Sequence, residues 1–178
     1  VEATRAHQLD PLSSVIGTTL GDTLYFSRRY DEAIAELNVI VSLWPEFLHA
    51  TNDLGRALTE RGRFDEAIEA FHTAARLSGG DPRSSAGLGR AYALAGRERE
   101  AREVLQVLEQ AATHRYVSAF GVATIHAALG ESDAAFHHLE RAFTMRDTAL
   151  VWANVHPRID PLRSDPRFDE LMRRMGPA

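Results

Sequence analysis

The chain of 178 residues contains no cysteine. This absence excludes disulfide bonds and zinc sites built from thiolates, and it is typical of proteins that fold in a reducing compartment. We therefore expect a cytoplasmic location. A chain of this length can bury a sizeable core without covalent cross-links.

Long apolar runs and lysine are also missing. The longest apolar stretches, such as Val39 to Trp44, are far shorter than the roughly 20 residues that span a bilayer, so no membrane span is expected. All 20 positive charges are arginine, and 25 acidic residues bring the net charge to −5. Because affinity for nucleic acid comes from an excess of positive charge, we expect no nucleic-acid partner.

Motifs for catalysis and for cofactor binding are absent as well. The sequence has no His-Glu-x-x-His pair, no Gly-x-Ser-x-Gly elbow and no phosphate loop. Gly87 and Gly89 lack the third glycine and the preceding strand of a dinucleotide fingerprint. The adjacent His137 and His138 would point about 100° apart on a helix rather than toward one metal ion. We expect no enzyme activity, no cofactor and no metal site.

What the sequence does contain is an internal period of 34 residues. Small residues recur at this spacing in two columns, and large apolar residues recur in two more. The small columns are Gly21, Gly55, Gly89, Ala123 and Ala33, Ala67, Ala101, Ala135; the large columns are Leu20, Leu54, Leu88, Val122 and Leu37, Phe71, Leu105, Leu139. Small residues let two helices approach closely, and large ones fill the space between neighbouring hairpins. The pattern predicts a stack of helical hairpins.

A turn signal separates the two halves of each unit. Gly62, Gly96 and Gly130 suit the left-handed residue that ends a helix. The acidic residues that follow favour the positive start of the next helix. Each unit is therefore expected to hold two antiparallel helices.

These features resemble the tetratricopeptide repeat. The resemblance rests on the small-residue columns, on the strings that begin Tyr30-Asp-Glu-Ala-Ile and Phe64-Asp-Glu-Ala-Ile, and on Pro45 at the end of a unit. It implies an all-α fold, a right-handed superhelix of four repeats at residues 14–47, 48–81, 82–115 and 116–149. The second repeat departs from the family pattern at Gly79-Gly80, and the fourth has Ala123 and His126 where glycine and tyrosine are typical.

The two ends of the chain differ from the repeats. Residues 1–13 are expected to be the end of a preceding partial repeat, whose exposed apolar end is a possible surface for self-association. Residues 150–178 are expected to form a C-terminal cap with a helix that starts at Asp165 and Pro166 and stops at Gly176-Pro177. The string from His156 to Phe168 resembles tails that follow repeat arrays in multidomain bacterial regulators and Ser/Thr kinases.

The resemblance also implies that the first helix of each hairpin lines a concave face. Helical spacing selects the residues of those helices that point away from their partner helix. The set is Asp22, Tyr25, His49, Asn52, Arg56, Arg83 and Arg90, continued by Phe120 and Thr124. Three guanidinium groups, of Arg56, Arg83 and Arg90, would converge and hold a carboxylate, while Asn52 would hold a peptide amide. The alternative is that the arginines pair with carboxylates of Glu60, Asp53 or Asp22 within the array.

The aromatic residues also allow two interpretations. Trp44, Trp152, Tyr116, Phe136 and Phe143 are either a set that stacks on a ligand or part of the packing between repeats, and their spacing favours packing. The leading functional hypothesis is a protein-interaction module whose concave groove binds a peptide or helix, possibly acidic. The alternative is a structural or oligomerisation segment of a larger multidomain bacterial protein.

Overall fold

The computed structural model describes residues 2–176, and helices are the only regular secondary structure within that range. The α-helices run in chain order as α1 (Glu2–Leu9), α2 (Ser14–Phe26), α3 (Tyr30–Leu43), α4 (Leu48–Glu60), α5 (Phe64–Leu77), α6 (Pro82–Leu94), α7 (Glu98–Ala111), α8 (Ala119–Ala128), α9 (Ser132–Thr144) and α10 (Pro166–Met175). Two 3₁₀ helices, η1 (Thr148–Trp152) and η2 (Pro157–Leu162), lie between α9 and α10. Val1, Pro177 and Ala178, at the outer ends of the first and last predicted ranges, lie outside the described residues.

Each of the four expected repeat ranges contains one pair of helices: α2 with α3, α4 with α5, α6 with α7, and α8 with α9. Polar side chains cap the starts of several helices, because the first backbone N–H groups of a helix have no partner inside it. Ser13 and Ser118 accept hydrogen bonds from backbone N–H groups of α2 and α8. Asp81 does the same for α6 and Asp165 for α10, where proline follows as the first helical residue.

The columns at the 34-residue period form the contacts between helices. The four alanines of one column, from Ala33 to Ala135, are all fully buried. A Cβ atom added at Gly55 would lie 2.9 Å from the ring of Phe71 in the next helix. The small residues therefore set the distance between paired helices, and the large ones fill the core.

The turn between the helices of each pair uses one left-handed residue. Gly62, Gly96 and Gly130 have φ values of +78°, +73° and +78°. The corresponding residue of the first repeat is Arg28, whose φ is +60°. A side chain in this conformation is strained, and Arg28 therefore needs a compensating contact.

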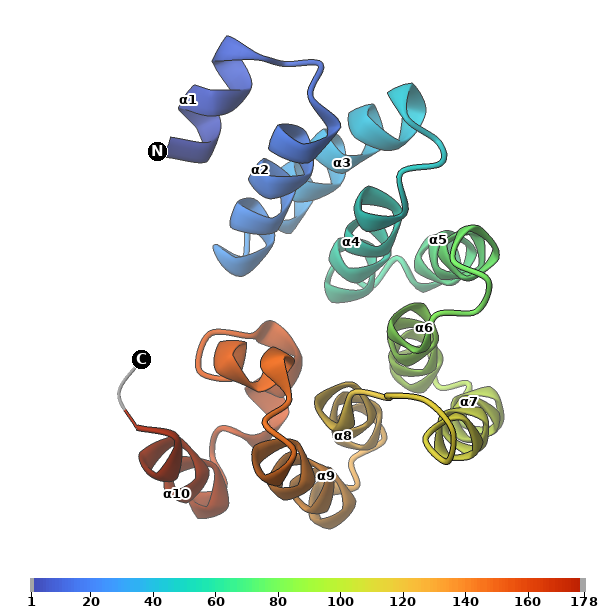
Figure 1. The fold of residues 1–178 in the computed structure, drawn as a ribbon, viewed down its shortest axis with the longest axis vertical. Coiled ribbons are helices and arrows are strands. Elements are labelled where there is room, and N and C mark those ends of the chain that lie inside the picture. The colour runs from blue at the N-terminus through green and yellow to red at the C-terminus, as the bar shows by residue number, and fades with distance from the viewer. Residues whose placement is uncertain (1, 177–178) are drawn as a thin grey trace.

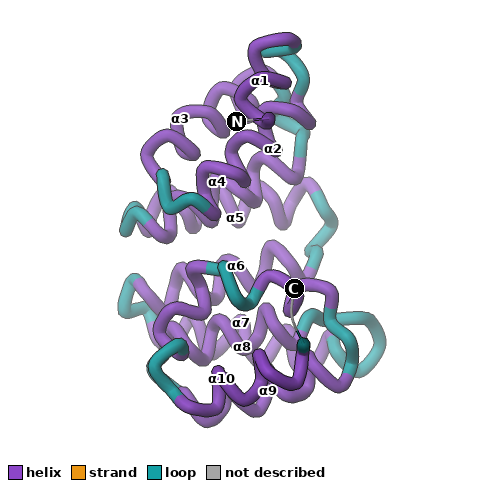
Figure 2. Tube along the Cα trace, turned by 90° about the vertical axis from the view of Figure 1, so that its left-hand side faces the viewer, coloured by secondary structure: helices purple, strands orange, loops and turns teal. Residues whose placement is uncertain are grey.

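The repeats form an α-α superhelix that curves around one side of the molecule (Figure 1). The first helices α2, α4, α6 and α8 contact one another along the inner side, and the second helices lie outside them (Figure 1). The tube in Figure 2 shows the helices stacked in one direction with the connecting loops at the edges. Both ends of the chain lie on the same side of the curve (Figure 1).

Two hydrophobic clusters make up the interior. The larger one runs from α2 to α8, and the smaller one joins α8 and α9 to η1, η2 and α10. Leu150, Ile159 and Leu162 of the 3₁₀ helices belong to the smaller cluster and are almost fully buried. The C-terminal region is thus a packed part of the fold. Within residues 2–176, no helix has the length and apolarity needed to cross a membrane.

Candidate binding groove

Arg56 lies in the middle of the concave face and is held by two carboxylates. Its Nη1 is 2.6 Å from Oδ1 of Asp53 and 3.2 Å from Oδ1 of Asp22. The guanidinium group also lies over the ring of Tyr25, 4.3 Å from its centroid. Arg56 is only 9% exposed. Burial and the neighbouring charge of Asp53 raise the pKa of Asp22, although Arg56 opposes both effects.

Arg90, one repeat later, pairs with Glu60. Its two terminal nitrogens lie 2.9 and 3.2 Å from the two carboxylate oxygens of Glu60. The hydroxyl of Tyr25 donates a third hydrogen bond to the same carboxylate, at 3.1 Å. Burial raises the pKa of Tyr25 to about 12, so this hydroxyl stays a donor at neutral pH. The ion pairs that the sequence offered as the alternative are therefore present in the structure.

The other predicted groove residues occupy different environments. Asn52 is buried and donates to the carbonyl of Leu48 within its own helix, whereas His49 lies beside Phe47 and is exposed. Arg83 is exposed at the start of α6, and its side chain forms no ion pair with any residue from 2 to 176. Phe120 and Thr124 of α8 are fully buried.

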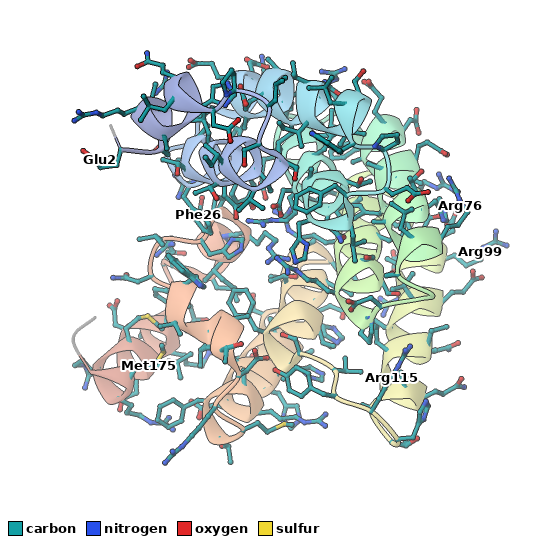
Figure 3. The ribbon with its side chains drawn as sticks, turned by 45° about the horizontal axis from the view of Figure 1, so that its top comes forward. Glu2, Phe26, Arg76, Arg99, Arg115 and Met175 are labelled. Carbon is teal, nitrogen blue, oxygen red and sulfur yellow. The ribbon has the colours of Figure 1, made fainter. Side chains whose placement is uncertain are left out.

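Residues 148–163, which we call the C-terminal segment, lie against the inner side of the array. Its aromatic contacts are with Phe120 of α8 and with α2, at the opposite end of the repeats. Trp152 stacks on Phe26, with ring centroids 5.4 Å apart, and His156 lies edge-on to the rings of Tyr25 and Phe26. Figure 3 shows Phe26 at this junction. The C-terminal cap predicted from the sequence therefore also covers part of the groove.

Arg158 of the C-terminal segment points into the same region. Its guanidinium group donates to Nε2 of His156, at 2.8 Å from Nη2. Unlike Arg56 and Arg90, Arg158 forms no ion pair with a carboxylate of residues 2–176. Burial lowers its pKa to about 10, and the positive charges of Arg56 and Arg90 act in the same direction. Burial, together with the charge of Arg158, also lowers the pKa of His156, so the ring is neutral.

A pocket with a volume of about 900 Å³ remains between the array and the C-terminal segment. We call it the groove pocket. Its lining includes Asp22 and Phe26 of α2, Arg56 of α4, Asp81 and Arg83 at the start of α6, Tyr116, Ser118 and Phe120 at the start of α8, and Asp147, Trp152, Val155, His156 and Arg158. It contains two of the three arginines that were expected to converge, Arg56 and Arg83. Arg90 does not line it.

Two exposed aromatic side chains form part of this lining. Tyr116 is 61% exposed and Trp152 is 55% exposed. Of the aromatic set expected to pack between repeats, Phe136 is buried and Phe143 is partly buried. Trp44, Tyr116 and Trp152 are exposed, although Trp152 stacks on Phe26. Tyr116 and Trp152 lie outside the paired helices, Tyr116 before α8 and Trp152 after α9. The repeat pattern therefore does not determine whether they are buried.

The carboxylates of the groove pocket are already engaged. Asp22 pairs with Arg56, and Asp81 accepts from the backbone N–H of Arg83. Asp147, which the sequence analysis did not single out, is buried and accepts from the hydroxyl of Ser118 and the backbone N–H groups of Phe120 and Ala149. Arg83 and Arg158 are the lining cations that lack a carboxylate partner among residues 2–176. The lining contains as many aspartates as arginines, three of each, so its free guanidinium donors rather than a net charge distinguish it.

Metal binding has no support from the described part of the chain. No group of three His, Cys, Asp or Glu side chains within residues 2–176 is placed to hold a metal ion. His126 stacks on His138, and Nδ1 of His126 lies 2.7 Å from a carboxylate oxygen of Glu131. This pair belongs to the fourth repeat and does not line the groove pocket.

Solved structures of repeat proteins are similar to this chain. The MamA protein of AMB-1 is 27% identical, with a TM-score of 0.56, over 65% of this chain and 63% of MamA. TTC0263, a TPR protein of Thermus thermophilus, is 19% identical, with a TM-score of 0.65, over 90% of this chain and 87% of TTC0263. YrrB, described as a TPR protein with an unusual peptide-binding site, is 17% identical, with a TM-score of 0.54, over 95% of this chain and 88% of YrrB. No curated protein sequence matches the chain.

Two family models, both described as tetratricopeptide repeat, match residues 18–82 and 58–120. Together these matches span more than half of the chain. They cover the first three members of each column at the 34-residue period and the left-handed turns at Arg28, Gly62 and Gly96, and the similar structures share the stacked helical pairs. This repeat is a scaffold fold for protein interaction rather than a catalytic one. Sequence columns, turn geometry and superhelix agree, and the chain belongs to the tetratricopeptide repeat family.

Proposed function

We propose that the chain binds a short segment of a partner protein in the groove pocket. The observation that carries this proposal is the combination of exposed aromatic rings and an unpaired cation in one concave site. Tyr116 and Trp152 are more than half exposed there, and Arg83 has no carboxylate partner within residues 2–176. Aromatic side chains and arginine are the residue types that contribute most to binding energy at protein interfaces.

The chemistry of the groove pocket defines the segment that it fits. The rings of Phe26, Tyr116 and Trp152 provide an apolar surface for a large side chain of the partner. The free guanidinium group of Arg83 favours an acidic side chain beside it, because such a pair forms charge-assisted hydrogen bonds. The volume of about 900 Å³ accommodates a few residues of a peptide. The preferred ligand is a segment with an acidic residue close to an aromatic or large aliphatic one.

The structure gives Arg56 and Arg90 a different environment from the ligand-binding cluster that their spacing in the sequence suggested. Both guanidinium groups pair with carboxylates of the array, and removing either would leave a buried charge unpaired. They join adjacent repeats, whereas Arg83 is free to pair with a ligand.

The test is selection of binding peptides from a displayed random library, followed by affinity measurement with purified variants. The variant pair Arg83→Ala and Tyr116→Ala changes exposed side chains of the groove pocket. A matched control pair, Arg99→Ala and Val107→Ala, removes an exposed arginine and an exposed apolar residue from α7 on the outer side, where Figure 3 shows Arg99 pointing outward. We expect binding to be roughly 10- to 150-fold weaker for the groove variant, since one charge-assisted hydrogen bond contributes about 1.5–3 kcal/mol.

Selected peptides that bind the groove variant and the wild type equally well, while losing affinity for the control variant, would place the interaction on the outer side. If no peptide that binds the wild-type chain can be selected, the result would contradict peptide binding in the groove pocket.

A further inference from the structure

Arg158 is a mostly buried cation that forms no ion pair with a carboxylate of residues 2–176. Its only hydrogen-bond acceptor among residues 2–176 is the neutral ring of His156, with Nε2 lying 2.8 Å from Nη2 and 3.2 Å from Nε of Arg158. A guanidinium group carries five N–H donors, so several of them have no protein partner. Burying a charge without a counter-charge is unfavourable. The fold keeps Arg158 in this position nevertheless.

The neighbouring carboxylates do not supply the missing charge. The charge of Glu60 acts to raise the pKa of Arg158, but both oxygens of Glu60 accept from Arg90 and one also accepts from Tyr25. Asp53 and Asp22 are bound to Arg56. The Nε of Arg56, which is buried, has no hydrogen-bond partner either. Donors of two arginines are therefore unused at the place where the array meets the C-terminal segment.

Both arginines line the groove pocket, so a ligand can reach them. Arg158 enters it from the C-terminal segment and Arg56 from α4. The charge of Arg56 contributes to the lowered pKa of Arg158, which places the two cations within electrostatic range. Two guanidinium groups that line one pocket, one of them without a carboxylate partner among residues 2–176, are suited to an anion with two oxygens.

We propose that Arg158 and Arg56 form an oxyanion site at the base of the groove pocket, which binds a carboxylate or a small free oxyanion. The site is distinct from Arg83 at the pocket rim, and half of it comes from a residue outside the repeats. The inference does not depend on a peptide being the natural ligand. If the proposed function holds, the oxyanion is a carboxylate of the bound segment.

The test measures anion binding directly. Thermal unfolding of the wild type is followed while sodium acetate or inorganic phosphate replaces sodium chloride at constant ionic strength. We expect a saturable rise in Tm, because a ligand that binds only the folded state stabilises it. The rise should disappear in Arg158→Met and persist in Arg99→Met, which removes an exposed arginine of α7. Equal rises in all three proteins would overturn the proposal.

A second measurement needs no variant and covers the case in which Arg158→Met does not fold. Backbone amide resonances of the wild type are followed by NMR during the same acetate and phosphate titrations. The amides of His156, Arg158 and Ile159 should shift saturably, while those of α7 should stay constant. Absence of a saturable shift at these three amides would overturn the proposal.

Competition separates this inference from the proposed function. Acetate that weakens peptide binding to the wild type but not to Arg158→Met would identify a peptide carboxylate as the occupant. Acetate binding without any peptide binding would support the oxyanion site and contradict the proposed function. Peptide binding that neither acetate nor the Arg158→Met substitution changes would support the proposed function and contradict the oxyanion site.

Discussion

Arg28 and Asp160, separated by 132 positions in the chain, form a two-point ion pair between the first repeat and the C-terminal segment. Nη2 of Arg28 lies 2.9 Å from Oδ1 of Asp160, and Nη1 contacts Oδ2. Arg28 occupies the left-handed position where the later repeats have Gly62, Gly96 and Gly130. The backbone of the first repeat is thus strained at Arg28, the residue whose side chain reaches across the groove to Asp160.

This arrangement predicts different stabilities for two substitutions at one position. Arg28→Ala removes the ion pair and keeps a side chain in the left-handed conformation. Arg28→Gly removes the ion pair and also relieves the strain. We expect the glycine variant to be more stable than the alanine variant by about 1 kcal/mol in urea unfolding. The pair with Asp160 is exposed, so its own contribution is at most about 1 kcal/mol. An alanine variant that equals the glycine variant would show that the left-handed conformation carries no strain.

The packing of the repeats gives a second prediction. Ala67 is fully buried where α5 contacts its partner helix. Replacing it by leucine overfills this contact and should lower the free energy of unfolding by about 1–3 kcal/mol. Glu69→Leu, on the exposed face of the same helix, is the control and should change it by less than about 0.5 kcal/mol. Equal unfolding midpoints for Ala67→Leu and the wild type would contradict the register of the repeats.

Asp147 gives a third prediction, at the end of the last repeat. Its carboxylate satisfies two backbone donors, the N–H groups of Phe120 and Ala149. In Asp147→Ala these donors lose their partner, and each costs about 1–3 kcal/mol if it stays buried. Asp133→Ala removes an exposed carboxylate that pairs with Arg167, and it should be close to neutral. Chemical denaturation monitored by circular dichroism compares the two, and similar losses for both variants would refute this role of Asp147.

Acidification should weaken the contact between α2 and the C-terminal segment. The pKa of His156 is lowered from its usual 6.5 by burial and by Arg158, so the folded state favours the neutral ring. Below about pH 6.5 the unfolded chain binds a proton that the folded chain does not. The free energy of unfolding therefore decreases as the pH is lowered. Between pH 7 and pH 5 we expect Tm to decrease more in the wild type than in His156→Gln.

The exposed His114 is the control for this experiment, and His114→Gln should retain the wild-type slope. The pKa of His138 is also lowered, to about 4, so His156→Gln should reduce the slope without abolishing it. If the dependence of Tm on pH is the same in His156→Gln and the wild type, a group other than His156 causes the acid sensitivity.

The sequence predicts the array well because the physical constraint repeats. Ala33, Ala67, Ala101 and Ala135 experience the same close helix contact, and the same residue type recurs at each one. The turn glycines recur for the same reason, since the left-handed backbone favours glycine. Family and fold follow from these columns, and both are confirmed.

The groove itself could not be predicted in the same way. The contacts of Arg28 with Asp160 and of Phe26 with Trp152 join residues more than 100 positions apart and occur only once, so no period reveals them. The pairing of Arg56 with Asp22, by contrast, links adjacent repeats, and the spacing of 34 residues made it a visible alternative. Binding by the predicted groove residues and self-association through the N-terminal end stay predictions.

An open array of repeats can lose its terminal units independently, because each unit contacts only its neighbours. The contact of the C-terminal segment with α2 links the first repeat to the last part of the described chain. Fraying at one end therefore removes a support from the other, and the two ends should melt together. A ligand in the groove pocket would contact both the array and the C-terminal segment, and would therefore stabilise both ends at once.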